Sequence, residues 1–206
     1  MQVLFVNGSP HENGCTDTAM REAARILEEQ GIQTRIFWLG AAPVGGCTGC
    51  GSCKATGKCV FGGPVNELID LVAQADGYVF GAPVHYAGPA ASLCGAMDRL
   101  FMAAGPAMRF KPAAAVTSAR RAGTTASLDR IQKYFDINNM LTVGSKYWNN
   151  VHGGCPDEVR QDEEGMQTMR QLGRNMAWTL RCLEAGKAAG IPLPEMETPI
   201  RTNYIR

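Results

Sequence analysis

The chain has 206 residues, of which 45% are hydrophobic and 19% charged, so the composition predicts one globular domain with a substantial core and excludes a disordered chain. Its 20 Lys and Arg residues against 19 Asp and Glu residues give a net charge of +1, so we expect neither nucleic acid nor a membrane as a partner. The apolar runs are shorter than the roughly 20 residues of a membrane span, and the first residues lack the pattern of a signal peptide, so we expect a cytoplasmic protein.

Apolar runs and helical spacings alternate along the chain. In chain order, they predict a strand at 3–6, a helix at 16–30, a strand at 33–39, a Gly- and Cys-rich loop at 40–63, a helix at 64–72, a strand at 77–82, a helix at 89–100, a strand at 113–117, a helix at 128–135, a strand at 140–143 and a helix at 159–189. Gly31 follows the first helix as a terminator, and Pro64 suits the first turn of its helix.

This alternation predicts a parallel sheet with helices on both faces. Right-handed crossovers in a chain of this size favour an α/β fold, a flavodoxin-like three-layer sandwich whose five-stranded parallel sheet has the order 2-1-3-4-5. We expect this domain to span residues 1–190, with the cysteine-rich loop 44–63 inserted after the second strand. Three prolines within residues 191–206 predict an extended C-terminal tail.

The loop after the first predicted strand has the composition of an anion site. Ser9, Asn13 and Thr16 offer hydroxyl and amide groups, and Gly14 frees the backbone in front of a helix N-terminus. A Walker A loop would have a lysine after Gly14, where this chain has Cys15, so a terminal monophosphate fits better than a triphosphate. The alternative is an ordinary turn with a helix cap at Thr16.

Two further loops follow the third and fourth predicted strands, and ligands of such sheets bind where the strands end. His85 and Tyr86 supply rings that could flank a planar heterocycle with a phosphate tail, or could simply pack within their loop. Backbone amides between Ser118 and Gly123 could bind the carbonyl groups of such a ring. A nearby Arg120 would favour negative charge on the reduced ring.

These motifs resemble the NADPH-dependent FMN reductase family. The resemblance rests on Gly8-Ser9-Pro10-x-x-Asn13-Gly14-x-Thr16, Ala82-Pro83-Val84-x-Tyr86, Met97-Asp98-Arg99 and the segment 147–153, and it extends from residue 1 to about residue 180. It implies FMN as the cofactor, which carries the chemistry, so no catalytic side chain is expected. The expected FMN site comprises Ser9, His11, Asn13, Gly14, Cys15, Thr16, Pro83, Val84, His85, Tyr86, Ala87, Gly88, Ser118, Arg120 and Gly123.

The Gly-rich loop holds four of the eight cysteines, Cys47, Cys50, Cys53 and Cys59. Three thiolates at two-residue intervals resemble the start of a ferredoxin motif, and the fourth completes a set of four metal ligands from one segment. The spacing favours a [4Fe–4S] cluster, with structural zinc or the absence of metal as alternatives. The compact motif also resembles that of the iron–sulfur flavoproteins, a subgroup of the same family.

The sequence therefore predicts an FMN-dependent oxidoreductase that takes electrons from NAD(P)H or a ferredoxin-like donor and passes them to a flavin, quinone or other acceptor. Two alternatives remain at this point. One is an iron–sulfur flavoprotein that carries electrons without turning over a substrate, and the other is a thiol or metal sensor on the same fold. The resemblance also implies that the protein associates with itself as a dimer or tetramer.

Overall fold

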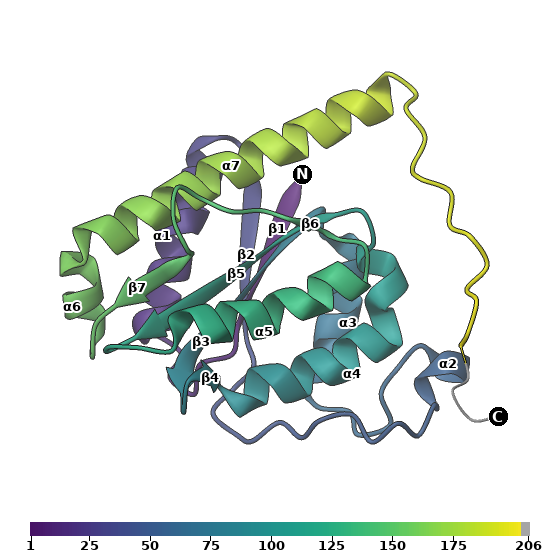
Figure 1. Cartoon of the computed structure of the whole chain (residues 1–206), viewed down its shortest axis with the longest axis horizontal. Coiled ribbons are helices and arrows are strands. Elements are labelled where there is room, and N and C mark those ends of the chain that lie inside the picture. The colour runs from purple at the N-terminus through teal and green to yellow at the C-terminus, as the bar shows by residue number, and fades with distance from the viewer. Residues whose placement is uncertain (203–206) are drawn as a thin grey trace.

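The computed structural model describes residues 1–202 and is built around a mainly parallel sheet (Figure 1). The strands are β1 (Gln2–Asn7), β2 (Gln33–Trp38), β3 (Gly77–His85), β4 (Gly88–Pro89), β5 (Pro112–Ala119), β6 (Leu141–Thr142) and β7 (Asn150–His152). The helices are α1 (Cys15–Glu29), α2 (Cys53–Thr56), α3 (Pro64–Gln74), α4 (Ala91–Met108), α5 (Thr124–Ile137), α6 (Pro156–Gln161) and α7 (Glu163–Ala188).

The strand order along the sheet is β2-β1-β3-β5-β6, and each neighbouring pair is parallel. Without the short β4, this order corresponds to the predicted 2-1-3-4-5, and the parallel α/β class is confirmed. The described chain has seven strands in the sheet where five were predicted. The additional strands are β4, which pairs antiparallel with β3, and β7, which pairs parallel with β5.

The fifth position of the sheet differs from the prediction of one strand at residues 140–143. There β6 covers only two residues and pairs with the start of β5, whereas β7 pairs with the end of β5. Gly144 and Ser145 interrupt the apolar run, and the Ser145 hydroxyl donates to the Tyr147 carbonyl at 2.8 Å, which turns the chain away from the sheet. Two short strands therefore share the edge that one was expected to fill.

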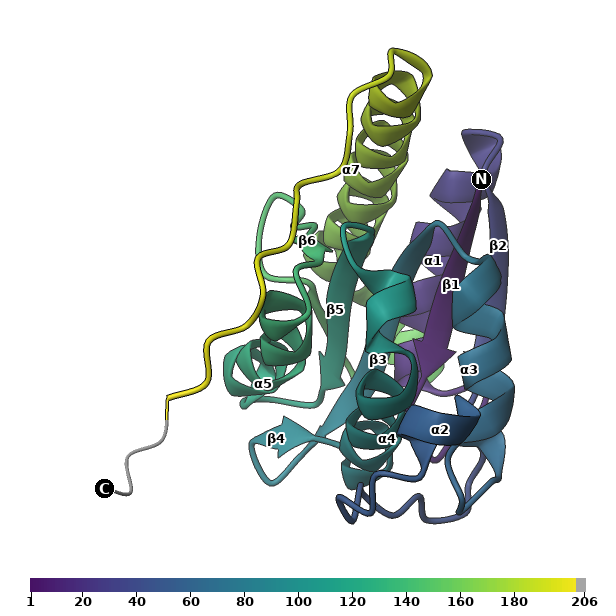
Figure 2. The same ribbon diagram turned by 90° about the vertical axis from the view of Figure 1, so that its right-hand side faces the viewer.

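Alternate side chains of the central strands pack into two hydrophobic cores, one on each face of the sheet. Leu4 and Phe80 pack on the side of α3, α4 and α5, whereas Val3 and Phe5 pack on the side of α1 and α7. This division follows because successive side chains of a strand point to opposite faces. The two helical layers around the sheet are visible in Figures 1 and 2 and give the predicted three-layer sandwich.

The helix predicted at residues 159–189 is divided at Asp162 into the end of α6 and the whole of α7. The backbone of Asp162 (φ −74°, ψ 79°) leaves helical geometry, and its side chain accepts a hydrogen bond from the Gly165 amide at 2.9 Å. Aspartate caps a helix in this way more favourably than it sits inside one. Residues 191–202 form neither helix nor strand, and residues 203–206 of the predicted tail lie outside the described residues.

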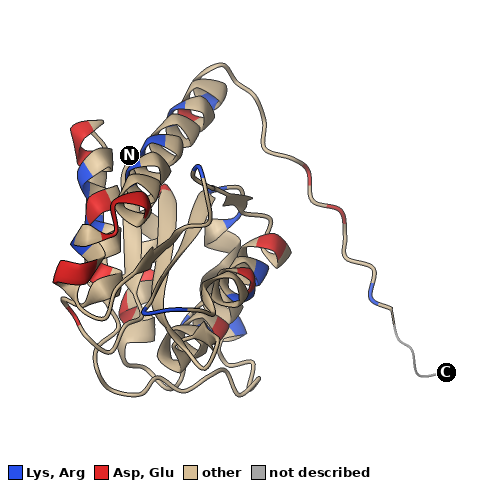
Figure 3. Ribbon diagram, turned by 60° about the vertical axis from the view of Figure 1, so that its left-hand side comes forward, with Lys and Arg blue, Asp and Glu red and all other residues tan. Residues whose placement is uncertain are grey.

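Charged residues of both signs are interspersed along the outer helices (Figure 3). On α1, Arg25 pairs with Glu22, which also accepts from Arg170 of α7 at 2.9 Å. Such pairs offset the charges of these residues on that face. None of the helices in the described part of the chain has the length and apolarity to cross a membrane.

Candidate functional site

The loops that follow β1, β3 and β5 meet at the carboxyl edge, the side of the sheet at which the parallel strands end. The Oγ1 atom of Thr16, at the start of α1, lies 2.9 Å from the Oγ atom of Ser118 on β5. A Cβ atom on Gly123 would lie 2.8 Å from both the Cα atom of Ala87 and the Cγ1 atom of Val84. These contacts bring together three loops that are far apart in the sequence.

The β1–α1 loop owes its shape to Asn7, a fully buried residue at the end of β1. Its Nδ2 donates to the Glu12 carbonyl and its Oδ1 accepts from the Ser9 amide, both at 3.0 Å. The Trp38 indole donates to the Ser9 carbonyl at 2.8 Å, and the Ser9 hydroxyl accepts from the His11 amide at 3.1 Å. Sequence reasoning missed Asn7, although a polar residue that directly follows a buried apolar run is a signal for such a role.

The N-terminus of α1 presents free amide groups to this loop. Its N-cap is Gly14, so no side chain caps the helix, and within residues 1–202 the amides of Cys15, Thr16 and Asp17 donate to no backbone acceptor. A Cβ atom on Gly14 would lie 3.0 Å from the His11 Cβ atom, so the loop is tight. Because free amides and the helix dipole both attract an anion, this end of α1 fits a phosphate group.

The alternative of a helix cap at Thr16 is wrong. Thr16 lies inside the first turn of α1, and its buried hydroxyl pairs with Ser118. The neighbouring Asp17 adds a carboxylate to the same turn, but Arg21 donates to it at 2.6 Å and offsets its charge. The N-terminal turn of α1 therefore keeps its attraction for an anion.

The hairpin of β3 and β4 carries the predicted flavin-facing rings at its tip. Tyr86 and Ala87 form the two-residue turn with φ values of +50° and +60°, the geometry of a type I′ turn, which costs free energy for residues with a side chain. Tyr86 is fully exposed. Gly123, at φ +94°, packs against this hairpin, so the turn is held from the β5–α5 loop.

The predicted FMN-site residues fall into three classes of exposure. At the surface lie His11, Asn13, His85, Tyr86, Ala87 and Arg120; partly buried are Gly14, Cys15, Pro83, Val84, Gly88 and Gly123; and buried are Ser9, Thr16 and Ser118. The exposed and partly buried members offer contacts to a ligand. The buried hydroxyls of Thr16 and Ser118 instead join two of the loops to each other.

A fourth segment, from β7 to α6, borders the same edge, and sequence reasoning assigned no site residue to it. Gly153 donates its amide to the Ala119 carbonyl at 3.0 Å, and the Cys15 thiol lies 3.7 Å from the Gly153 carbonyl oxygen. The pKa of the Cys15 thiol lies above its ordinary value, mainly because the thiol is partly buried and to a smaller extent because Cys155 is nearby. Cys15 therefore stays protonated and neutral at the N-terminus of α1.

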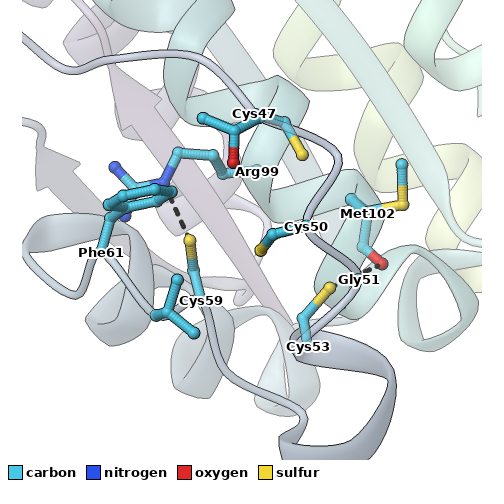
Figure 4. A pocket seen from close by; sticks show the side chains of 10 residues that line it. Cys47, Cys50, Gly51, Cys53, Cys59, Phe61, Arg99 and Met102 are labelled. Atoms are coloured by element: carbon cyan, nitrogen blue, oxygen red, sulfur yellow. Dashed lines mark hydrogen bonds between the residues drawn. The ribbon is translucent and has the colours of Figure 1, made fainter.

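The four cysteines of the β2–α3 loop line one pocket at the surface (Figure 4). Gly49 and Gly51, with φ values of +71° and +75°, turn the backbone between the first three cysteines, and α2 begins at Cys53. Cys47 and Cys50 are exposed, whereas Cys53 and Cys59 are partly buried. The remaining lining comes from Thr48, Gly51, Val60, Phe61, Arg99 and Met102.

Cys59 is held more firmly than the other three cysteines. Its amide donates to the Asn66 side chain at 2.8 Å, and the Asn66 amide group donates back to the Cys59 carbonyl at 3.0 Å. Arg99 of α4 donates through Nε to the Cys59 sulfur at 3.1 Å and through Nη2 to the Gly62 carbonyl at 2.6 Å. The pocket thus combines thiols with one buried positive charge.

Four thiols in one pocket are the type of ligand set that an iron–sulfur cluster takes. Across residues 1–202, no three Cys, His, Asp or Glu side chains are close enough to share one metal ion. Hydrogen bonds from the backbone and side chain of Ser52 hold the pKa of Cys50 below its ordinary value, which favours the thiolate that a metal requires.

Comparison with known proteins identifies the family. Residues 1–153 match the family described as NADPH-dependent FMN reductase. The chain belongs to this family. An iron–sulfur flavoprotein of Methanocaldococcus jannaschii is 32% identical to this FMN reductase family member over 192 residues, which cover 89% of this chain and 100% of the relative. That similarity places the chain in the iron–sulfur flavoprotein subgroup.

Solved structures show the fold of this family member independently. RosB, solved with a bound 8-demethyl-8-formylriboflavin-5′-phosphate, has a TM-score of 0.72 at 14% identity, over 100% of this chain and 92% of that chain. A flavodoxin from the domain Archaea has a TM-score of 0.60 at 14% identity, over 88% of this chain and 99% of that chain. The flavodoxin-like fold is confirmed, and family membership confirms FMN as the expected cofactor and a flavoprotein oxidoreductase or electron carrier as the class of protein.

Proposed function

We propose that the protein takes electrons from NAD(P)H or a ferredoxin-like donor and delivers them to a flavin, quinone or other acceptor. The convergence of the β1–α1, β3–β4 and β5–α5 loops beside the free amides of α1 is the observation that carries this proposal. When bound, FMN accepts electrons in pairs and releases them singly, and a [4Fe–4S] cluster passes single electrons. The chain's own residues bind, orient and shield these groups.

The β1–α1 loop supplies the phosphate position in this proposal. Asn7 fixes the loop through its two hydrogen bonds. The Ser9 hydroxyl, the Asn13 side chain and the first amides of α1 would then bind the same anion. The site contains neutral donors and an offset Asp17–Arg21 pair rather than a free lysine. These groups support a monophosphate ligand, because the β1–α1 loop, as described within residues 1–202, has no unpaired positive charge that would neutralise a chain of phosphates.

The other two loops supply the position of the flavin ring and ribityl chain. Residues 83–88 and residues 118–123 would both border the ring, and Gly123 packs the second of these loops against the hairpin. The exposed Arg120 lies on the second loop and would stabilise negative charge on the reduced ring. Tyr86, which stands free at the tip, would cover the ring or meet a partner of the flavin site.

Cys47, Cys50, Cys53 and Cys59 are the proposed ligands of a [4Fe–4S] cluster, which the name of the relative from Methanocaldococcus jannaschii supports. Two of the four are exposed, so a cluster here would lie near the surface, where an external electron partner can approach it. We further propose a cytoplasmic protein that assembles as a dimer or tetramer.

Anaerobic purification followed by an absorption spectrum, flavin release on heating, and iron and sulfide analysis tests the proposal. Steady-state oxidation of NADH and of NADPH with a quinone acceptor then tests turnover, with free FMN at equal concentration as the control. A protein without releasable FMN contradicts the proposed function. A flavin that is reduced without any turnover of quinone supports an electron carrier in place of an enzyme.

A further inference from the structure

Arg99 is a buried, positively charged residue beside the cysteine pocket, and it has no acidic partner among residues 1–202. The residue is only 7% exposed, and Figure 4 shows its side chain reaching from α4 to the sulfur of Cys59. No carboxylate among residues 1–202 lies within the 4.0 Å limit of an ion pair with it. The adjacent Asp98 instead faces Arg130 at 3.7 Å and accepts a hydrogen bond from Tyr134.

A buried guanidinium without a counter-charge is unfavourable, so its surroundings must supply negative charge. The groups it contacts are the Cys59 sulfur, the Gly62 carbonyl and the ring of Phe61, whose centroid lies 5.9 Å from the guanidinium carbon. Of these, only the sulfur can become an anion. The charge of Arg99 is therefore complementary to thiolates, or to an anionic cluster that thiolates hold.

We propose that Arg99 is a positioning residue that raises the reduction potential of the four-cysteine centre. This inference rests on the proposed function, because it takes the four cysteines to hold an iron–sulfur cluster. One electron entering the cluster adds one negative charge, and a fixed positive charge beside Cys59 stabilises that reduced state more than the oxidised one. Cluster potentials depend on local charge and on hydrogen bonds to the sulfurs, and Arg99 supplies both.

A purely structural role is the competing explanation, because Arg99 also ties the loop to α4 through Gly62. Two variants separate these roles. Arg99→Gln removes the charge and keeps a side-chain amide, whereas Arg99→Lys keeps the charge. Lys54→Gln is the matched control, since it removes the same charge from an exposed residue next to Cys53.

An anaerobic redox titration, followed by visible absorbance and electron paramagnetic resonance, measures the cluster and FMN potentials in the same protein. We expect Arg99→Gln to shift the equilibrium of the cluster with a mediator dye by about tenfold towards the oxidised form, or 59 mV for a one-electron couple. Arg99→Lys and Lys54→Gln should shift it less, and the FMN potential should stay constant. A cluster in Arg99→Gln with the wild-type potential, or with no greater shift than in Lys54→Gln, overturns the proposal.

Iron and sulfide content of each variant completes the test. Loss of the cluster from Arg99→Gln together with its retention in Arg99→Lys supports the charge role. Loss from both variants, with FMN still bound, overturns that role and assigns Arg99 to anchoring the loop. A wild-type protein that holds no iron or sulfide after anaerobic reconstitution overturns the cluster in the proposed function, and this inference with it. An Arg99→Gln variant that holds a cluster of unchanged potential overturns this inference alone.

Discussion

Substitution of Gly123 by alanine should separate the two loops that we assign to the flavin ring. At φ +94°, any residue with a side chain costs about 1–2 kcal/mol of backbone free energy. The new Cβ atom would also lie 2.8 Å from the Cα atom of Ala87 and from Val84, and relief of such overpacking typically costs about 1–3 kcal/mol. The free energy of unfolding should therefore fall by roughly 2–5 kcal/mol.

Gly40 provides the matched control, because its φ is +91° and a Cβ atom there would meet nothing within 4 Å. Gly40→Ala should lose only the backbone contribution of about 1–2 kcal/mol. Urea unfolding of the flavin-free proteins, followed by circular dichroism, measures both losses. FMN affinity, measured by quenching of flavin fluorescence, should fall about tenfold or more in Gly123→Ala alone. A displaced loop that lost about 1.4 kcal/mol of binding free energy would produce that factor. Equal losses of stability in the two variants, or an unchanged FMN affinity in Gly123→Ala, would refute this reasoning.

Three further predictions address the phosphate position, the cluster and the tail. Ser9→Ala should weaken FMN by about 1.5–3 kcal/mol in an affinity titration and riboflavin by much less, because only FMN carries the charged group that this hydroxyl would meet; equal losses would contradict the assignment. Cys50→Ala should abolish the iron–sulfur absorption and keep stoichiometric FMN, with Cys182→Ala on α7 as the control, whereas loss of FMN from the Cys50 variant would show that the two sites are coupled. Removal of residues 191–206 should lower the sedimentation coefficient towards that of a monomer, because Ile191, Leu193 and Ile200 are exposed and available to a second copy; an unchanged coefficient excludes this role of the tail.

Elements with a local signal were predictable from the sequence. The apolar runs located β1 and β3, Gly31 follows α1 at φ +74°, and Pro64 is the first residue of α3. The β4 strand gave no such signal, because two residues are too few for a period and the turn holds Tyr86 and Ala87 where Asn-Gly would mark a hairpin. The break at Asp162 was missed because the apolar spacing continues across it.

The candidate site was predictable as a neighbourhood but not as a set of contacts. The rule that ligands bind where parallel strands end selected the loops with Ser9, Tyr86 and Ser118. It could not pair Thr16 with Ser118, which is 102 residues away, or Arg99 with Cys59, which is 40 residues away. Such contacts depend on how α1 and α4 pack on the sheet, and a single sequence holds no periodic signal for them.

The cysteine loop joins two elements that are secured without it. Strand β2 pairs with β1 along its length, and α3 buries Val65, Leu68 and Val72 in the core. Loop length adds little to the entropic cost of closure, about 0.6 kcal/mol for each doubling. If the loop holds the proposed cluster, a chain made during a shortage of iron, or stripped of metal by oxygen, would therefore still fold its sheet and present the flavin loops. Loss of the proposed cluster would then leave the flavin domain folded.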